Sequence, residues 1–173
     1  MFEKLKTVLR ILAKGVFYRE LFRNGTHYLY EHILPMETLR VGSNPEIHPT
    51  VSFRFENNIA LGDNIVLDAH CCLWASENSK ITLGDNTGVG PGTVMVSSNH
   101  SFPKGKIYVE EPMSEKNIVV GNHVWIGANS TLLAGAEIGN GCIVGAGCVI
   151  SAKIPENSVV VSGSRKLSIV KRR

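Results

Sequence analysis

The side chains best suited to chemistry in this chain are its histidines and cysteines. The 173 residues include six histidines and four cysteines. No two cysteines form a CxxC pair, which disfavours a zinc or redox motif and fits reduced thiols in a cytoplasmic protein. Histidine titrates near neutral pH, so it is the side chain most suited to a general base. His100 lies directly before a long irregular stretch, about residues 101–117.

Composition predicts a short helical arm followed by a long β body. The chain has 18 Val and 14 Ile against 14 Leu and 9 Ala, and β-branched residues favour strands over helices. Residues 1–40 hold 7 Leu and 4 Val plus Ile, whereas residues 41–173 hold 7 Leu and 28 Val plus Ile. The apolar content of 43% excludes a disordered chain. No run reaches the ~20 apolar residues of a membrane span, and no signal-peptide core is present, so we expect a cytoplasmic location.

The β body contains a repeat of six residues. Position one is aliphatic, position two is often Gly, and position five is small or apolar. Position one of each unit is Val41, Ile47, Phe55, Leu61, Leu67, Leu73, Leu83, Val89, Met95, Val120, Ile126, Leu132, Ile138, Val144 or Ile150. In the last six units, position five is Val124, Ser130, Ala136, Cys142, Cys148 or Ile154.

A period of six suits a coil with short flat faces and sharp corners, in which positions one and five point inward. The pairs Asp63-Asn64, Asp85-Asn86 and Asn140-Gly141 supply residues that tolerate the left-handed backbone that such corners need. Three of the cysteines, Cys71, Cys142 and Cys148, occupy position five. We therefore interpret them as small interior residues and not as ligands.

Both ends of the chain lie outside the repeat and are basic. The sequence divides into an arm (1–40), a repeat domain (41–161, with a loop at 101–117) and a basic tail (162–173). Phe2, Leu5, Leu9, Leu12 and Val16 recur at helical spacing, with basic residues on the other faces. Such a helix packs on the body or a neighbouring subunit, or makes peripheral contact with an anionic membrane. No aromatic-basic interleaving accompanies the charge, so we expect no nucleic-acid partner.

Residues 117–155 resemble the hexapeptide-repeat acyltransferases. The motifs that carry the resemblance are Val124-Trp125-Ile126-Gly127 and Gly145-Ala146-Gly147 before Ile154-Pro155. They are most similar to the galactoside and maltose acetyltransferases and to the small acetyltransferases of lipopolysaccharide and capsule gene clusters. The resemblance covers about residues 41–161. It implies an all-β fold, a left-handed parallel β-helix of about five triangular rungs, and a homotrimer with its sites between subunits.

The resemblance also implies a catalytic histidine. Family members carry one in a Gly-His or Asn-His step at a corner, and Asn99-His100 matches that place. His100 would take the proton of an attacking hydroxyl, and Asn99 or a backbone amide would stabilise the oxyanion. Asp68 is a candidate for the acceptor site, and Asp68, Glu110, Glu111 and Glu115 are candidates to orient His100. A corner histidine bonded only to backbone is the structural alternative.

Acetyl-CoA is the cofactor that the resemblance implies, with no metal. The residues expected to bind it are Gly90, Trp125, Ala128, Ala146, Ser151, Lys153 and Lys166. The small residues would leave a groove for the pantetheine arm, and basic residues would meet its phosphates. Trp125 could instead form an intersubunit contact, and the basic tail could simply be solvated.

The implied activity is transfer of an acetyl group to a sugar hydroxyl, in a surface polysaccharide or its precursor. N-acetylation of a nucleotide-linked amino sugar is the alternative on the same scaffold. A three-histidine zinc enzyme is disfavoured because the histidines occupy different positions in the repeat. A scaffold with a vestigial site is the non-catalytic alternative.

Overall fold

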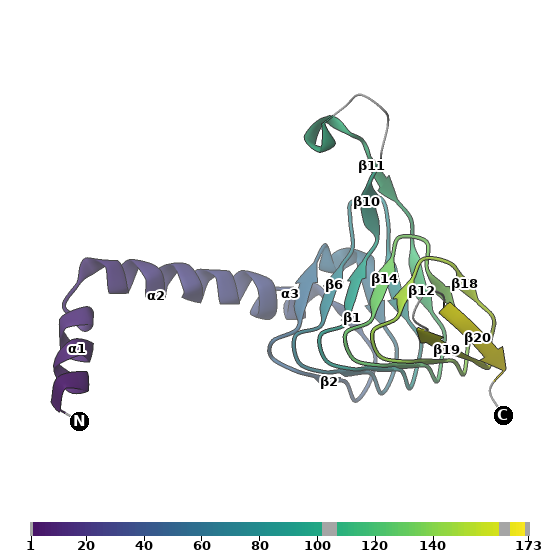
Figure 1. The fold of residues 1–173 in the computed structure, drawn as a ribbon, viewed down its shortest axis with the longest axis horizontal. Coiled ribbons are helices and arrows are strands. Elements are labelled where there is room, and N and C mark those ends of the chain that lie inside the picture. Colours follow the sequence, from purple (N-terminus) through teal and green to yellow (C-terminus); the bar gives the residue numbers. More distant parts are fainter. Residues whose placement is uncertain (1, 102–106, 163–166, 172–173) are drawn as a thin grey trace.

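The main body of the protein is a parallel β-helix (Figure 1). The computed structural model describes residues 2–101, 107–162 and 167–171. Short strands wind through three parallel sheets, here called A, B and C, so that the coil has a triangular cross-section. The predicted parallel β-helix with an N-terminal arm is confirmed.

The strands of each sheet follow one another at a spacing of one turn of the coil. Sheet A contains β1 (Arg40–Val41), β4 (Ile59–Leu61), β7 (Ile81–Leu83), β12 (Ile118–Val120), β15 (Glu137–Ile138) and β18 (Lys153–Ile154). Sheet B contains β2 (Glu46–Ile47), β5 (Val66–Leu67), β8 (Gly88–Val89), β13 (Trp125–Ile126), β16 (Ile143–Val144) and β19 (Ser158–Ser162). Sheet C contains β3 (Ser52–Arg54), β6 (Cys72–Trp74), β9 (Val94–Val96), β14 (Thr131–Leu133) and β17 (Val149–Ile150).

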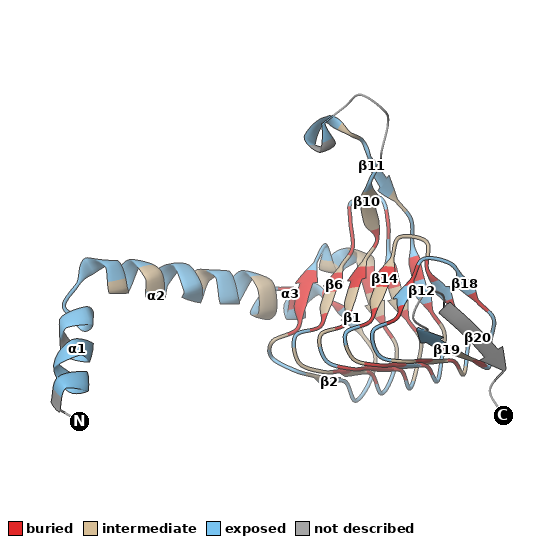
Figure 2. Cartoon of the chain, viewed as in Figure 1, coloured by how far each residue is buried: buried red, intermediate tan, exposed pale blue. Residues whose placement is uncertain are grey.

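The core consists of aliphatic side chains that stack in register from turn to turn. On sheet B, for example, Leu67 pairs with Val89, Val89 with Ile126, and Ile126 with Val144. These inward side chains are at most 1% exposed. The red inner positions in Figure 2 trace this core along the coil. Burial of a column of aliphatic side chains, at ~25 cal/mol per Å² of apolar surface, is the main stabilising contribution here.

The spacing between inward residues is fixed at two corners and variable at the third. From sheet A to B and from B to C the step is always six residues, as from Leu61 to Leu67 to Leu73. From sheet C to the next sheet A, the corner here called the C–A corner, the step varies. It runs from Phe53 to Leu61, Leu73 to Leu83, Met95 to Val120, Leu132 to Ile138 and Ile150 to Ile154.

The structure corrects the predicted frame at two positions and adds a turn to the coil. Phe53 is the inward residue of β3 and is 3% exposed, whereas Phe55 begins a 3-10 turn, η2 (Glu56–Asn58), and is 53% exposed. Ile154 is the inward residue of a new turn, paired with Ile138, and not a fifth position. Because β18 and β19 begin a further turn, the coil has about six turns instead of five.

The corner between sheets A and B is held by a ladder of side chains. The Asp85 carboxylate accepts a hydrogen bond from the Asp63 amide at 2.9 Å, and the Asn122 side chain accepts one from the Asp85 amide at 2.9 Å. Asn64 and Asn86 both have positive φ, as predicted for these corners. Hydrogen bonds from Ser43 hold the pKa of Asp63 below its ordinary value.

Gly84 stands in this corner where the next turn leaves no room for a side chain. A Cβ there would lie 2.7 Å from the carbonyl carbon of Gly121. Gly84→Ala is therefore expected to lower the free energy of unfolding by about 2 kcal/mol. Gly25→Ala is the matched control, because a Cβ at Gly25 meets nothing within 4 Å and helical Ala is more stable than Gly by ~0.5–1 kcal/mol. Urea unfolding at fixed protein concentration measures both, and equal effects would contradict the packing at this corner.

The N-terminal arm projects from the first turn of the coil (Figure 1). It consists of α1 (Phe2–Leu12), α2 (Gly15–Tyr28), a π-helical turn η1 (Leu29–Ile33) and α3 (Pro35–Thr38). No residue of α2 is buried, whereas Pro35 is. Among the described residues, none of the helices has the length and apolar character required to cross a bilayer.

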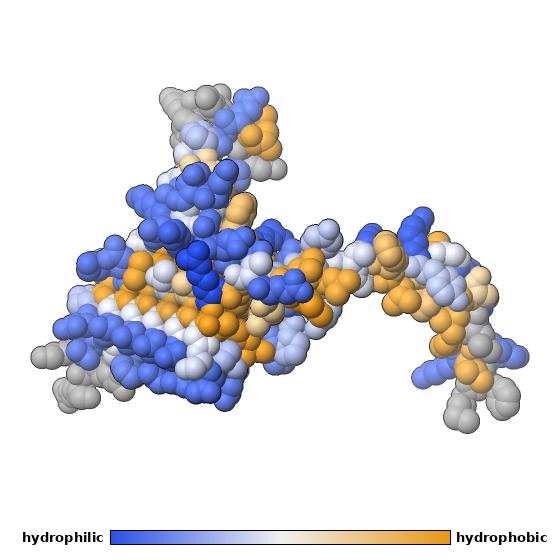
Figure 3. Space-filling model, turned by 180° about the vertical axis from the view of Figure 1, so that it is seen from behind, coloured by the Kyte–Doolittle hydropathy of each residue, from blue (hydrophilic) through white to orange (hydrophobic). Residues whose placement is uncertain are grey.

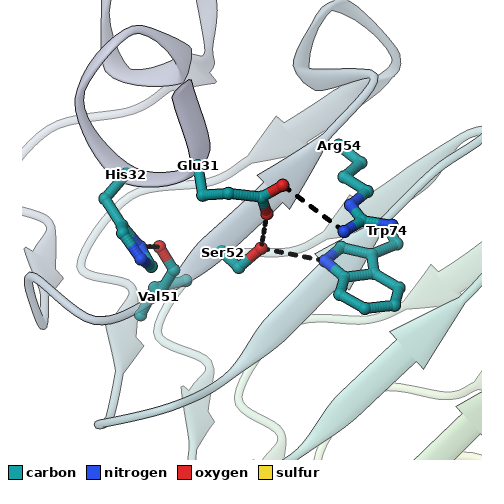
Figure 4. A network of polar contacts seen from close by, with 6 residues as sticks. All are labelled: Glu31, His32, Val51, Ser52, Arg54 and Trp74. Carbon is teal, nitrogen blue, oxygen red and sulfur yellow. Dashed lines mark hydrogen bonds and ion pairs between the residues drawn. The ribbon is translucent and has the colours of Figure 1, made fainter. Parts of the chain in front are cut away.

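A polar network fixes the arm to sheet C (Figure 4). The Ser52 hydroxyl donates to Glu31 at 2.5 Å, and the Trp74 indole donates to Ser52 at 3.0 Å. Arg54 lies 3.3 Å from Glu31 and stacks over Trp74 at 3.9 Å. Burial raises the pKa of Glu31, but the Ser52 hydrogen bond and the Arg54 charge outweigh it, so the pKa lies below its ordinary value.

This network predicts that acid loosens the arm. Because the pKa of Glu31 is lower in the folded state, its stabilising contribution is present above the ordinary value of 4.5 and lost as pH falls through the folded value. Trp125→Phe leaves Trp74 as the single tryptophan. In this variant, the fluorescence emission of Trp74 should change as pH falls through the folded-state pKa of Glu31. Glu31→Gln should remove the acid transition, and Glu37→Gln should leave it in place. A transition that survives Glu31→Gln would assign the effect to another group.

The C-terminal segment adds a further strand. Residues Leu167–Lys171 form β20, which pairs antiparallel with β19. Part of the basic tail therefore extends sheet B beyond the parallel coil.

Candidate active site

The long excursion at the C–A corner contains a hairpin that carries Asn99 and His100. Strand β10 (Ser98–His100) continues directly from sheet C and pairs antiparallel with β11 (Met113–Glu115). Ser98 is opposite Glu115, and His100 is opposite Met113. Between the strands lies a 3-10 turn, η3 (Tyr108–Glu110). The His100 side chain is exposed near the start of the excursion, in the hairpin that rises above the coil in Figure 1.

Glu115 fixes the base of this hairpin to the preceding turn of the coil. Its Oε2 accepts hydrogen bonds from the Ser76 hydroxyl at 3.0 Å and from the Asn78 amide at 2.7 Å. Ser76 in turn contacts Ser79, whose hydroxyl lies 2.6 Å from that of Ser97 at the start of the hairpin. Hydrogen bonds to a charged group are about twice as strong as neutral ones. The sequence proposed Glu115 as a partner of His100, but its Oε2 holds the hairpin to the coil.

An open pocket of about 550 Å³ lies at the base of the hairpin. Its lining includes Glu115, Lys116 and Asn117 from the excursion, and Glu137 and Ser151 from later turns. Ser151 is a predicted cofactor contact. Ser98 is opposite Glu115, which lines this pocket. His100 is two residues further along β10, so its Cα lies about 7 Å from that of Ser98 at the rise of a strand. The pocket, Ser151 and the hairpin of His100 therefore share one corner.

Other predicted cofactor residues lie at the B–C corner, the turn between sheets B and C. Gly90, Ala128 and Ala146 each follow a strand of sheet B. The register places Gly90 beside Gly127, one residue before Ala128, because Val89 pairs with Ile126. A Cβ on Gly90 would lie 2.8 Å from the Ala128 amide nitrogen. The close approach of the next turn is therefore enough to explain why residue 90 is a glycine, without any role in cofactor binding. Ala128 and Ala146 are at least partly exposed.

Trp125 and Lys153, two further predicted cofactor residues, lie on different sheets of the coil. Trp125 is 49% exposed on sheet B, and a Cβ on Gly88 would lie 2.7 Å from its ring. The Trp125 ring therefore covers β8 of the preceding turn. Lys153 is exposed on sheet A and pairs with Glu137 at 3.0 Å. Lys166 lies outside the described residues.

Asp68 and the remaining body histidines stand away from His100. Asp68 lines a smaller hollow of about 270 Å³ on sheet B, next to Ile47 and His48. His70 and His123 occupy corner positions with positive φ. Within the described residues, no three His, Cys, Asp or Glu side chains are grouped to hold a metal.

The cysteines that the repeat placed inside are buried. Cys71, Cys142 and Cys148 are 0% exposed. Burial raises the pKa of Cys71 to about 11, so its thiol stays protonated at neutral pH and is a poor nucleophile. The interpretation of these thiols as interior packing residues is confirmed.

Comparison with known proteins agrees with the repeat and the coil. Residues 117–152 match the family model described as bacterial transferase hexapeptide (six repeats). Residues 117–152 therefore carry the hexapeptide repeat, and they form successive turns of the β-helix.

Several individual relatives are similar over much of the chain. Galactoside O-acetyltransferase of Escherichia coli K12 is 31% identical over 71% of this chain. WbbJ of the same strain, named as a proposed lipopolysaccharide biosynthesis O-acetyl transferase, is 31% identical over 63% of this chain. Each match spans 59% of the relative's own length.

A solved structure of a hexapeptide-repeat acetyltransferase from Vibrio cholerae superposes with a TM-score of 0.71. It is 25% identical and covers 80% of this chain and 77% of its own. A complex of that protein with acetyl coenzyme A superposes with a TM-score of 0.73 at 22% identity, over 92% of this chain and 90% of its own.

The anchoring of the hairpin by Glu115 can be measured without substrate. Glu115→Gln weakens two charge-assisted hydrogen bonds, so the Lys116 amide, which donates to the Ser97 carbonyl at 3.0 Å, should exchange with solvent at least about tenfold faster. Glu137→Gln is the control, because Glu137 pairs only with exposed Lys153 on sheet A in the described part of the chain. Unchanged protection of Lys116 in Glu115→Gln would show that the carboxylate does not hold the hairpin.

Proposed function

We propose that this protein transfers an acetyl group from acetyl-CoA to a hydroxyl of a saccharide. The observation that carries the proposal is the C–A corner, where an open pocket with Ser151 in its lining lies at the base of the hairpin that bears His100. The named activities of galactoside O-acetyltransferase and WbbJ support a sugar hydroxyl as acceptor and a surface polysaccharide or its precursor as the final product. A cytoplasmic location belongs to the same proposal.

In this proposal His100 acts as general base on the acceptor hydroxyl. The imidazole takes the hydroxyl proton while the oxygen attacks the thioester carbonyl. The C–S bond then breaks, and the departing sulfur of coenzyme A takes the proton from the imidazolium. Asn99 or a backbone amide donates to the oxyanion. Direct attack needs no covalent enzyme intermediate, which fits a chain whose three interior cysteines are inaccessible.

Glu111 is the excursion carboxylate that best fits an orienting role. Glu115 is committed to Ser76 and Asn78, and Glu110 is exposed. Glu111 is half-buried, and its buried Oε2 accepts no hydrogen bond within the described structure. A carboxylate that accepts from one ring nitrogen fixes the tautomer of the other.

The proposed cofactor residues are split between two corners, and this split supports a site shared by subunits. Ala128 and Ala146 lie at the B–C corner, whereas Ser151 lies at the C–A corner. Acetyl-CoA that touches both groups would run along sheet C, whose outward Val149 is 52% exposed. A second copy packed against this face would enclose the cofactor, as a homotrimer with three interface sites requires. Asp68 follows β5 of sheet B and not the C–A corner of His100, so it would join the acceptor site only from a neighbouring copy.

Replacement of His100 tests the proposal directly. His100→Ala should lower kcat for acetyl-CoA-dependent acetylation by about 10²–10⁴-fold, the usual contribution of a general base, with coenzyme A affinity unchanged. His27→Ala is the control, because His27 is an exposed residue of α2, outside the coil and its pockets. Unchanged turnover in His100→Ala would refute the assigned base.

The same acetyl-CoA turnover assay, run with hydroxyl sugars and with amino sugars, identifies the class of acceptor. The proposal expects turnover with hydroxyl sugars, and sole or equal activity on a nucleotide-linked amino sugar would favour the N-acetyltransferase alternative. No turnover with either class, at an intact fold, would favour a non-catalytic scaffold.

A further inference from the structure

The distal arm, residues 2–27, leaves an apolar surface uncovered by its own chain. Large apolar or aromatic side chains between 37% and 75% exposed occur along both helices: Leu5, Val8, Ile11, Leu12, Val16, Tyr18, Leu21 and Phe22. The contacts that fix the arm begin only at Tyr28, Glu31 and His32. In Figure 3 apolar side chains run along the arm, with hydrophilic ones at its edges. Protein surfaces normally expose large apolar side chains singly, whereas here eight of them are exposed along two short helices.

Most of the exposed apolar residues gather on one side of each helix. At about 100° per residue, Leu5, Val8, Ile11 and Leu12 fall within an arc of about 120° on α1. On α2, Tyr18, Leu21 and Phe22 fall within an arc of about 100°, and Val16 at the start of the helix lies outside it. Each helix therefore presents an apolar stripe. Aromatic residues in such stripes are typical of the membrane–water interface.

Cations border these stripes. Residues 1–23 contain six basic and two acidic residues, whereas residues 24–164 contain 7 basic and 13 acidic ones. The two glutamates pair with Lys6, Arg19 and Arg23. Lys4, Arg10 and Lys14 have no acidic partner in the described part of the chain. The positive charge of the protein is thus at the two ends of its sequence, with a net charge of +4 over residues 1–23 and +5 over residues 165–173. On the arm, this charge lies beside the apolar stripes.

We propose that the distal arm lies on an anionic lipid surface. The apolar stripes would enter the boundary between headgroups and acyl chains, and the bordering cations would contact lipid phosphates. The acidic body, residues 24–164, would be repelled by the same surface, so within residues 1–164 the contact would be confined to the arm. A second copy of the chain is the other surface that could cover the stripes, and the experiment separates the two.

Vesicle co-sedimentation of the full-length protein tests this proposal. Binding is expected to vesicles of 70% phosphatidylcholine and 30% phosphatidylglycerol, to be weaker at 0.5 M salt, and to be absent from pure phosphatidylcholine. Lys4→Gln with Arg10→Gln should weaken binding at least about tenfold, at ~1 kcal/mol for each cation near the surface. The matched control is Arg40→Gln with Lys80→Gln, which removes two exposed cations from the body and should leave binding unchanged.

An apolar variant and a mass measurement complete the test. Leu5→Ser with Phe22→Ser should abolish vesicle binding and leave the mass by light scattering unchanged. Failure of the wild-type protein to bind anionic vesicles overturns the proposal, as does an equal loss in the body control. Loss of oligomeric mass in the apolar variant would assign the stripes to a second copy. None of these readouts requires acetyl transfer, so the lipid contact can fail while the proposed function stands.

Discussion

The structure depends above all on the in-register stacking of inward aliphatic side chains between successive turns of the coil. Each turn buries its aliphatic residues against those of the turns on either side, and backbone hydrogen bonds join the same turns. Side chains in a column can meet only if the step between corners stays constant. The constant six-residue steps from A to B and from B to C are the direct consequence. Each strand is too short to be stable without its neighbours.

The same constraint explains where the functional elements can be. Extra residues are tolerated only at the C–A corner, where the step varies from four residues (Ile150 to Ile154) to 25 (Met95 to Val120). The longest insertion is the excursion with His100, and it occurs between two complete turns that fix both of its ends. A hairpin tied down by Glu115 can therefore hold polar side chains in place although few of its residues are buried. Placement of chemistry on a loop that a rigid scaffold positions is common in proteins.

Much of the coil could be predicted from sequence because six residues is the distance between inward positions on successive sheets. The inward positions, the interior cysteines and the left-handed corners at Asn64 and Asn86 all follow from it. The error at Phe55 concerns where the extra residues stand. Phe53 and Phe55 are both aromatic and two residues apart, but the constant six-residue step from Ile47 and the stacking on Leu73 select Phe53, and the extra residues follow it at the C–A corner. The role of Glu115 depends on Ser76 and Asn78, almost 40 residues away in sequence, and no local signal reports that contact.

Both ends of a stacked coil expose unpaired strand edges. In this chain, a strand covers the C-terminal edge and a helical segment covers the N-terminal one. At the C-terminal end, β20 pairs with β19 and covers the edge of sheet B. At the N-terminal end, η1 packs on β3 through Glu31, Ser52 and His32, and Leu39 and Pro35 are buried beside the first turn. Covering an exposed edge prevents uncontrolled pairing with other chains. Residues 28–39 are sufficient for that cap, because α2 buries none of its residues and α1 lies farther from the coil. The distal arm therefore makes no buried contact with the coil in the described structure, and its apolar side chains are left uncovered by its own chain.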